Sequence, residues 1–346
     1  MFKKLQFEKI LTNLFFLVGS LLFVLKLYFF SPENIDFGII FHKEKIAELN
    51  FFSKLLYDNF KVFPYAQLLK FFYSFGFERP NFIFCFLSAF SFQYGIYLFW
   101  KKSNSEFNSF YAIITTLSLF LLSSPFVGNS IFYGFFPSET PTGLLFQGFI
   151  PLFLYSLYFN YQKSIFIFLL IFSFGHPSMG IIATTIYFCY FYIRFNRVGN
   201  AYFILPTIII SVFLLYVNNG QINLSEETYE AYVYLRNISH LKPWINQHFW
   251  INTILLVLST LIVIFGFDET DKSLLITLLV TSIVFGLVQY IADSFYSLNL
   301  ISLNCGRAHN FLFCFMIMIV LKNIFRNGND YLFYIIVFTS KFILDF

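Results

Sequence analysis

The chain has 346 residues, of which 58% are hydrophobic and only 12% are charged. This composition leaves too few polar residues to cover a water-soluble surface, so it excludes a soluble globular protein and predicts a polytopic membrane protein. The formal net charge of +4 lies mostly at loop ends, as orientation signals do, and indicates no nucleic-acid partner.

Long apolar runs predict an all-α fold, because helices are the plausible spanning element for runs of about 20 residues. We expect a transmembrane helical bundle of about 9–11 spans, forming a single integral membrane domain over residues 1–346. The first run follows three lysines and has no small-residue cleavage site, so we expect it to be retained. The predicted spans cover residues 10–30, 81–100, 109–128, 142–161, 201–217, 249–267, 273–292, 309–325 and 331–346.

The apolar segment 164–193 is interrupted by the sequence FGHPSMG, which places His176 and Pro177 in its middle. Basic residues precede and follow the segment, at Lys163 and at Arg194, and positive charge marks the cytoplasmic side. The sequence therefore predicts a broken re-entrant hairpin of two helices of about 12–15 residues, each too short to span, with His176 near the tip. One long tilted helix with a proline kink is the alternative.

The hairpin fixes the predicted orientation of the chain. It gives a cytoplasmic N-terminus in what we expect to be a bacterial inner membrane, and it places the long loops on the outer face. These outer loops cover residues 31–80, 129–141, 217–248 and 293–308.

The first outer loop contains an apolar face at helical spacing over residues 41–60, which predicts an amphipathic helix at the membrane surface. Asp36 and Asp58 flank this helix. Either carboxylate could act as a general base on a sugar hydroxyl or hold a divalent metal that bridges phosphates. The alternative is an ordinary solvated carboxylate.

Two further outer loops carry candidate binding residues. Glu139, framed by prolines, would anchor a site or only cap the helix that begins near Thr140. Arg236 and His240 are four residues apart and would share one helix face close to Trp244, a combination suited to a phosphate and a sugar. An interfacial belt without function is the alternative.

The fourth outer loop ends in GRAHNF, which places Arg307 and His309 at the start of a span. An arginine at this position is costly enough to predict a partner, either a substrate phosphate or a structural carboxylate such as Glu139 or Asp293.

His176 lies at the predicted helix break, where backbone groups need partners from protein or from a water-filled cavity. Its ring would donate to a phosphate or transfer a proton, or it would only close the turn. The histidines form no metal motif such as HExxH, and the sequence specifies no metal and no cofactor.

The amphipathic loop helix, the HPSMG break, and the YLRNISHLKPW loop followed by GRAHNF together resemble a family of uncharacterised bacterial multi-pass membrane proteins. The layout is also similar to the GT-C superfamily of glycosyltransferases, which use polyprenyl-phosphate sugars and have broken membrane helices and a catalytic acidic residue in the first outer loop. This chain has no clear DD, ED or DE pair in that loop. A weaker resemblance is to O-antigen polymerases and ligases.

These resemblances imply a glycosyltransferase-like protein that acts on a polyprenyl-phosphate-linked sugar at the outer face, in cell-surface glycan assembly, with membrane lipids around it. The alternative from another class is a transporter or flippase for a lipid-linked or polar solute. The expected catalytic residues are Asp58, Asp36, His176 and His240. The expected substrate-binding residues are Arg236, Arg307, Glu139, Trp244 and His309.

Overall fold

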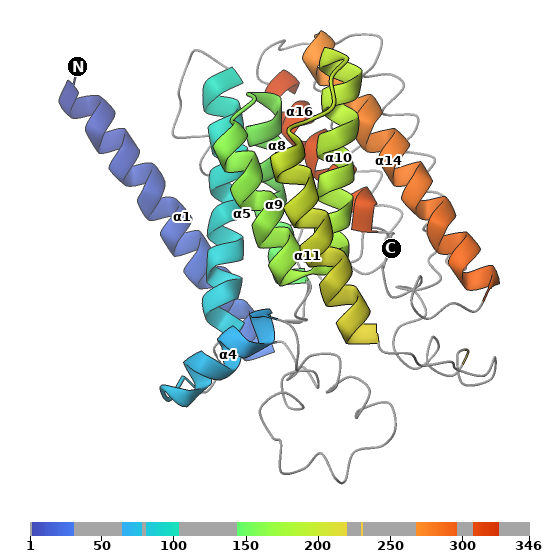
Figure 1. The fold of residues 1–346 in the computed structure, drawn as a ribbon. Helices are drawn as coiled ribbons and strands as arrows, with labels where there is room; N and C mark the ends of the chain where they lie inside the picture. The colour runs from blue at the N-terminus through green and yellow to red at the C-terminus, as the bar shows by residue number, and fades with distance from the viewer. Residues whose placement is uncertain are drawn as a thin grey trace. The chain divides into compact units, whose positions relative to one another are not determined.

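A computed structural model describes residues 2–30, 64–77, 81–103, 144–219, 230, 268–295 and 307–324. Every regular element in these ranges is a helix (Figure 1), so the predicted all-α membrane bundle is confirmed. Four of the described helices are long and apolar enough to cross a membrane: Phe7–Leu25, Asn81–Ser103, Pro177–Phe195 and Glu269–Ser294. The predicted surface helix over 41–60 and the spans over 109–128, 249–267 and 331–346 lie outside the described residues.

The chain divides into two compact units, each assembled from segments distant in sequence. The first unit comprises Met1–Pro32, Asn81–Gln162 and Phe313–Phe346, and the second comprises Glu33–Pro80 and Lys163–Leu312. The single domain expected from the sequence stays a prediction.

In the first unit, helix α1 (Phe2–Phe30) packs against α5 (Asn81–Ser103) through a buried amide. The Nε2 atom of Gln93 donates to the Ser20 hydroxyl at 2.9 Å and to the Phe16 carbonyl at 3.4 Å. Both polar side chains are fully buried. Interhelical hydrogen bonds of this kind stabilise membrane helix pairs, on average by about 0.6 kcal/mol.

The predicted span over 142–161 is divided and shorter. A 3₁₀ helix, η2 (Leu144–Phe149), leads into the nine-residue helix α8 (Ile150–Tyr158). Pro151 lies in the first turn of α8, where its missing N–H group costs no helical hydrogen bond. After α8, Asn160 ends the segment in a left-handed conformation with φ of 57°. Gly148 faces the backbone of Ser88, where a Cβ atom would lie 2.3 Å from the carbonyl oxygen, so η2 follows α5 closely.

The second unit contains the predicted helix break. Helix α9 (Gln162–Gly175) ends and α10 (Pro177–Phe195) begins at His176, whose φ and ψ of −150° and 98° are not helical. A Cβ atom on Gly180 would lie 2.6 Å from the Cα of Ser173. Residues seven apart in a continuous helix lie about 10 Å apart along its axis, so the chain folds back at the break (Figure 1). The predicted break and reversal are confirmed.

The predicted length of the second limb is wrong. Helix α9 has 14 residues, as expected, but α10 has 19, because it continues through its last turn, which contains Arg194, to Phe195. A 19-residue helix measures about 28 Å, close to the hydrocarbon thickness of about 30 Å. The tip at His176 is therefore a full span away from the end of α10.

Small polar residues join the hairpin to α11 (Ala201–Asn219). The hydroxyls of Thr184 in α10 and Thr207 in α11 lie 3.0 Å apart, and the Ser173 hydroxyl in α9 lies 3.4 Å from the Thr207 carbonyl. Gly180 approaches Ser211 at the same contact. Small residues permit this close packing, since helices in lipid associate mainly through tight contacts and hydrogen bonds. The second unit also contains α4 (Pro64–Ser74).

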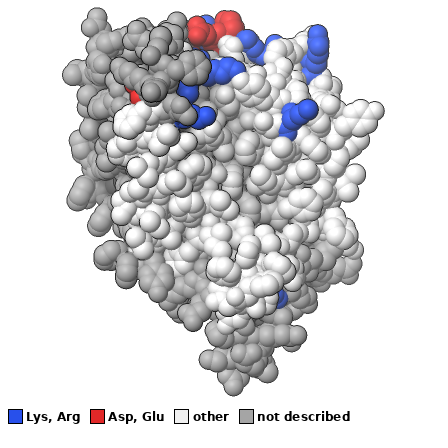
Figure 2. All heavy atoms as spheres, turned by 90° about the vertical axis from the view of Figure 1, so that its left-hand side faces the viewer, with Lys and Arg blue, Asp and Glu red and all other residues white. Residues whose placement is uncertain are grey.

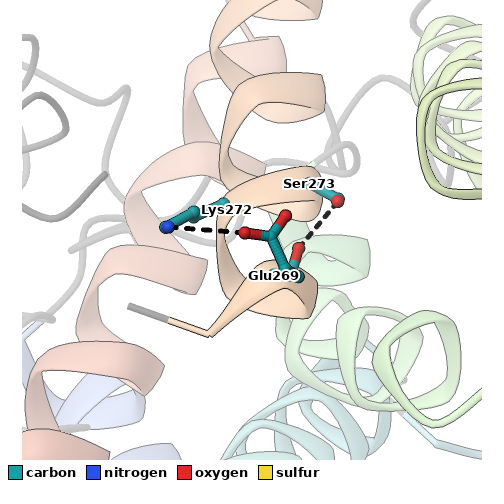
Figure 3. A network of polar contacts seen from close by, with 3 residues as sticks. All are labelled: Glu269, Lys272 and Ser273. Atoms are coloured by element: carbon teal, nitrogen blue, oxygen red, sulfur yellow. Dashed lines mark hydrogen bonds and ion pairs between the residues drawn. The ribbon is translucent and has the colours of Figure 1, made fainter. Parts of the chain in front are cut away.

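Helix α14 (Glu269–Ser294) packs against α10 in the opposite direction. Tyr190, near the end of α10, lies within electrostatic range of Asp271 in the first turn of α14. The same turn holds an ion pair of 3.5 Å between Lys272 and Glu269, and Ser273 donates to the Glu269 carbonyl (Figure 3). We call this the charged end of the unit. It contains the start of α9, the end of α10 and the start of α14.

The described part of the face drawn in Figure 2 carries few charges. Most of the described atoms on the face drawn in Figure 2 are white, so few of their side chains carry charge. Large apolar side chains such as Ile209, Val284 and Leu287 are half exposed or more. Such a surface fits contact with lipid chains.

Candidate functional site

The opposite end of the second unit brings three elements together. The first is the α9–α10 break, the second is the later half of α14, and the third is the start of α16 (Ala308–Ile324). The Phe311 ring packs edge-on against Phe172, one turn before the break, with centroids 5.7 Å apart. His309 approaches Gly286 of α14, where a Cβ atom would lie 3.8 Å from the His309 Cε1 atom. We call this the polar end.

Buried polar side chains gather on the elements of the polar end. Asn310 is fully buried, and neither atom of its side-chain amide has a hydrogen-bond partner in the described part of the chain. The Ser282 hydroxyl on α14 is also buried, and it too has no hydrogen-bond partner among the described residues. A buried polar group without a partner costs about 1–3 kcal/mol, so a ligand that supplied partners would recover that free energy.

The spacing of α14 explains how these groups come together. Ser282, Gly286 and Gln289 are four and three residues apart, which places them on one helix face. The contact between Gly286 and His309 turns that face toward α16. On α16, Asn310 lies about 100° around the helix from His309. His309, in the first turn of α16, therefore lies beside the polar face of α14.

Arg307 lies directly before α16 and is 6% exposed. An arginine is always charged at neutral pH, and a buried charge in a membrane protein marks a functional or paired position. The N-terminus of α16 adds a partial positive charge at the same point. The local field therefore favours an anion. The alternative pairing with Asp293 stays a prediction, and Glu139 lies outside the described residues.

His176 is the N-terminal cap of α10 and is half-buried. Its backbone N–H donates to the Phe172 carbonyl at 2.8 Å, and its own carbonyl accepts from Gly180 at 3.1 Å. The protein itself therefore supplies partners for the backbone of His176, which is one of the two alternatives expected from the sequence. The ring Nδ1 lies 3.1 Å from the Ser178 hydroxyl. When Nδ1 accepts this bond, the ring proton is on Nε2, which can then donate to a ligand.

The structure thus groups Arg307 and His309 at one helix start, and places His176 one turn beyond the Phe172 ring that touches the same helix. Sequence reasoning missed Asn310, Ser282 and Gln289. Their signal was a set of polar residues at helical spacing inside apolar runs. The other predicted site residues lie outside the described residues: Asp36, Asp58, Glu139, Arg236, His240 and Trp244.

The described residues contain no group of three histidine, cysteine or acidic side chains that could hold a metal ion. The polar end offers a cation, an amide, a hydroxyl and imidazole groups, which suit recognition of phosphate oxygens and sugar hydroxyls.

The fold and this cluster define an all-α, multi-pass membrane protein with buried polar residues around an arginine. Comparisons with models of protein families, with curated proteins and with solved structures found no match to the chain. The resemblance to GT-C glycosyltransferases therefore stays a prediction.

Proposed function

We propose that the protein is a glycosyltransferase-like membrane enzyme that uses a polyprenyl-phosphate-linked sugar at the outer face, in cell-surface glycan assembly. The observation that carries the proposal is the buried Arg307 at the start of α16, next to His309 and the buried amide of Asn310. Arginine binds phosphate through paired N–H donors, and such charge-assisted bonds are about twice as strong as neutral ones.

The depth of the cluster supports an enzyme at the membrane surface. Gly286, which contacts His309, lies 17 residues after Glu269 and therefore about 26 Å along α14. The His176 tip lies about 28 Å from the other end of α10. A transporter would hold its solute near the midplane of the bilayer. Both distances favour a site close to one surface, where a lipid phosphate resides.

In the proposed reaction, Arg307 and Arg236 hold the donor phosphate and neutralise the charge that builds on it as the sugar leaves. His176 and His240 orient the phosphate or move a proton, and Asp58 or Asp36 takes the proton of the acceptor hydroxyl. Glu139, Trp244 and His309 complete the binding site.

Binding of a polyprenyl phosphate to the purified full chain tests the proposal. We expect Arg307→Gln to weaken binding about 10- to 100-fold, because a hydrogen bond to a charged group contributes about 1.5–3 kcal/mol. Arg307→Lys keeps the charge and should retain part of the affinity. Lys272→Gln, at the charged end, is the matched control and should bind as the wild type does.

Equal binding by wild type and by folded Arg307→Gln would exclude a phosphate site at the polar end. A parallel measurement in cells separates the two classes of function. Loss of an enzyme should change the pool of lipid-linked sugars and the surface glycan, whereas an unchanged pool at normal protein level would contradict the enzyme.

A further inference from the structure

Lys102, in the last turn of α5 in the first unit, is exposed and surrounded by aromatic rings. Its Nζ atom lies 4.6 Å from the centre of the Phe159 ring and 4.4 Å from that of the Tyr161 ring. It also donates a hydrogen bond to the Tyr161 hydroxyl. No carboxylate in the described ranges forms an ion pair with Lys102, so its charge is balanced only by ring faces and a phenol.

Two groups stabilise negative charge on the oxygen of Tyr161. Lys102 donates a hydrogen bond to it, and the hydroxyl of Tyr155 acts from the neighbouring ring, whose centre lies 5.5 Å from that of Tyr161. Lys102 first, and then Tyr155, hold the pKa of Tyr161 below its ordinary value. A site that favours negative charge on one oxygen, by an ammonium and a hydroxyl together, is built to receive an anionic oxygen.

The backbone keeps Tyr161 in place. Asn160 ends α8 in the left-handed region, and the Tyr161 N–H then donates to the Ser156 carbonyl at 2.8 Å. The Tyr161 ring is exposed, so rotation about its side-chain bonds can move the hydroxyl away without disturbing the helix end. The two donors would then face a ligand.

A second cation belongs to the same aromatic cluster, which we define as Tyr155, Tyr158, Phe159 and Tyr161. Lys322 of α16 is 3% exposed, donates to the Tyr158 hydroxyl at 3.1 Å and lies 5.4 Å from its ring centre. Its buried charge adds to the positive potential. Lys101, the neighbour of Lys102, is exposed beside Tyr97.

We propose that Lys102 and Tyr155 bind the phosphate of an anionic lipid headgroup, with Lys101 adding positive charge nearby, and that the Tyr161 hydroxyl occupies the position of the phosphate when no lipid is bound. A lipid fits better than free phosphate, because Lys102 ends a 23-residue apolar helix and so lies at headgroup level, among aromatic rings typical of the interface. This site is separate from the one proposed for the enzyme.

Native mass spectrometry of the full chain with added phosphatidylglycerol tests the site, with phosphatidylcholine as the neutral lipid. We expect tighter binding of phosphatidylglycerol, weakened about fivefold in Lys102→Gln and about 25-fold when Lys101→Gln is added, at about one such factor per lysine. Lys102→Arg should bind as the wild type does. Tyr161→Phe removes the competing hydroxyl, so it should bind phosphatidylglycerol more tightly.

The matched control is Lys272→Gln, whose lysine already pairs with Glu269 and should not affect binding. The proposal is overturned if Lys102→Gln behaves like this control, or if the two lipids bind equally. It is also overturned if Tyr161→Phe weakens binding, or if inorganic phosphate competes as well as the lipid does. Lys102→Arg shows whether a loss in Lys102→Gln comes from charge or from misfolding.

Discussion

Substituting Gly180 by alanine should destabilise the second unit, although alanine is the better helix former. A Cβ atom at this position would lie 2.6 Å from the Cα of Ser173 and 2.5 Å from the Ser211 hydroxyl. The first of these contacts is with backbone, so α9 and α10 must move apart. Overpacking costs about 1–3 kcal/mol or more, against about 1 kcal/mol gained from helix propensity. We expect a net loss of about 1–2 kcal/mol, taken from the upper part of that range.

Gly286→Ala is the matched control, because it makes the same change in a helix of the same unit. The nearest atom to its new methyl group is the Cε1 of His309 at 3.8 Å, an ordinary contact. This variant should therefore keep the propensity gain and become more stable by up to about 1 kcal/mol.

Thermal unfolding of the purified protein in detergent measures both variants. At about 2–4 °C per kcal/mol for a unit of this size, Gly180→Ala should lower the Tm by about 2–8 °C and Gly286→Ala should raise it by about 2–4 °C. Adding Ser173→Ala to Gly180→Ala should recover little, because the contact with the Ser173 Cα remains. If Gly180→Ala unfolds at or above the wild-type temperature, the close fold-back at the break is wrong.

Three further predictions concern buried amides and one phenol. Gln147→Leu should raise the Tm, because the fully buried Gln147 amide has no hydrogen-bond partner in the described part of the chain and such a group costs about 1–3 kcal/mol; a lower Tm would contradict this. The same substitution at Gln93, Gln93→Leu, should lower the Tm by about 1–3 °C, since it removes the hydrogen bond to Ser20. An unchanged Tm would mean that this hydrogen bond does not contribute to stability. Lys102→Met should raise the Tyr161 pKa toward its ordinary value, so that Tyr161 ionises at higher pH in a difference titration of tyrosinate absorbance; identical curves would exclude the bond between the two side chains.

The position of the helix break could be predicted because its causes are local. Pro177 lacks an N–H group and disfavours helix at the residue before it, and both effects are written in the sequence. The length of the second limb could not be predicted in the same way. The prediction placed its end before Arg194, but a basic residue can lie in the last turn of a helix, where it complements the dipole.

The site was predicted only in part, for a similar reason. Arg307 and His309 could be predicted because a charged or titratable group beside a span costs free energy, so its presence indicates a function or a partner. Asn310 and Ser282 have no charge, and their importance depends on burial without a partner in the described part of the chain, which only the three-dimensional structure reveals. The division of the predicted span over 142–161 into two helices could not be predicted either, since it depends on the close contact between Gly148 and the backbone of Ser88.

The contact between α1 and α5 bears on how the protein is assembled. The Ser20 hydroxyl already donates to the Phe16 carbonyl within α1, at 2.7 Å, and most of the outward face of this helix is apolar. Helix α1 can therefore insert into the bilayer before α5, because its Ser20 hydroxyl already has a hydrogen-bond partner within the helix. Gln93 donates to the Ala89 carbonyl within α5, and its bond to Ser20 forms when the two helices meet. During synthesis, α5 therefore gains an interhelical hydrogen bond from α1, the helix already present in the membrane.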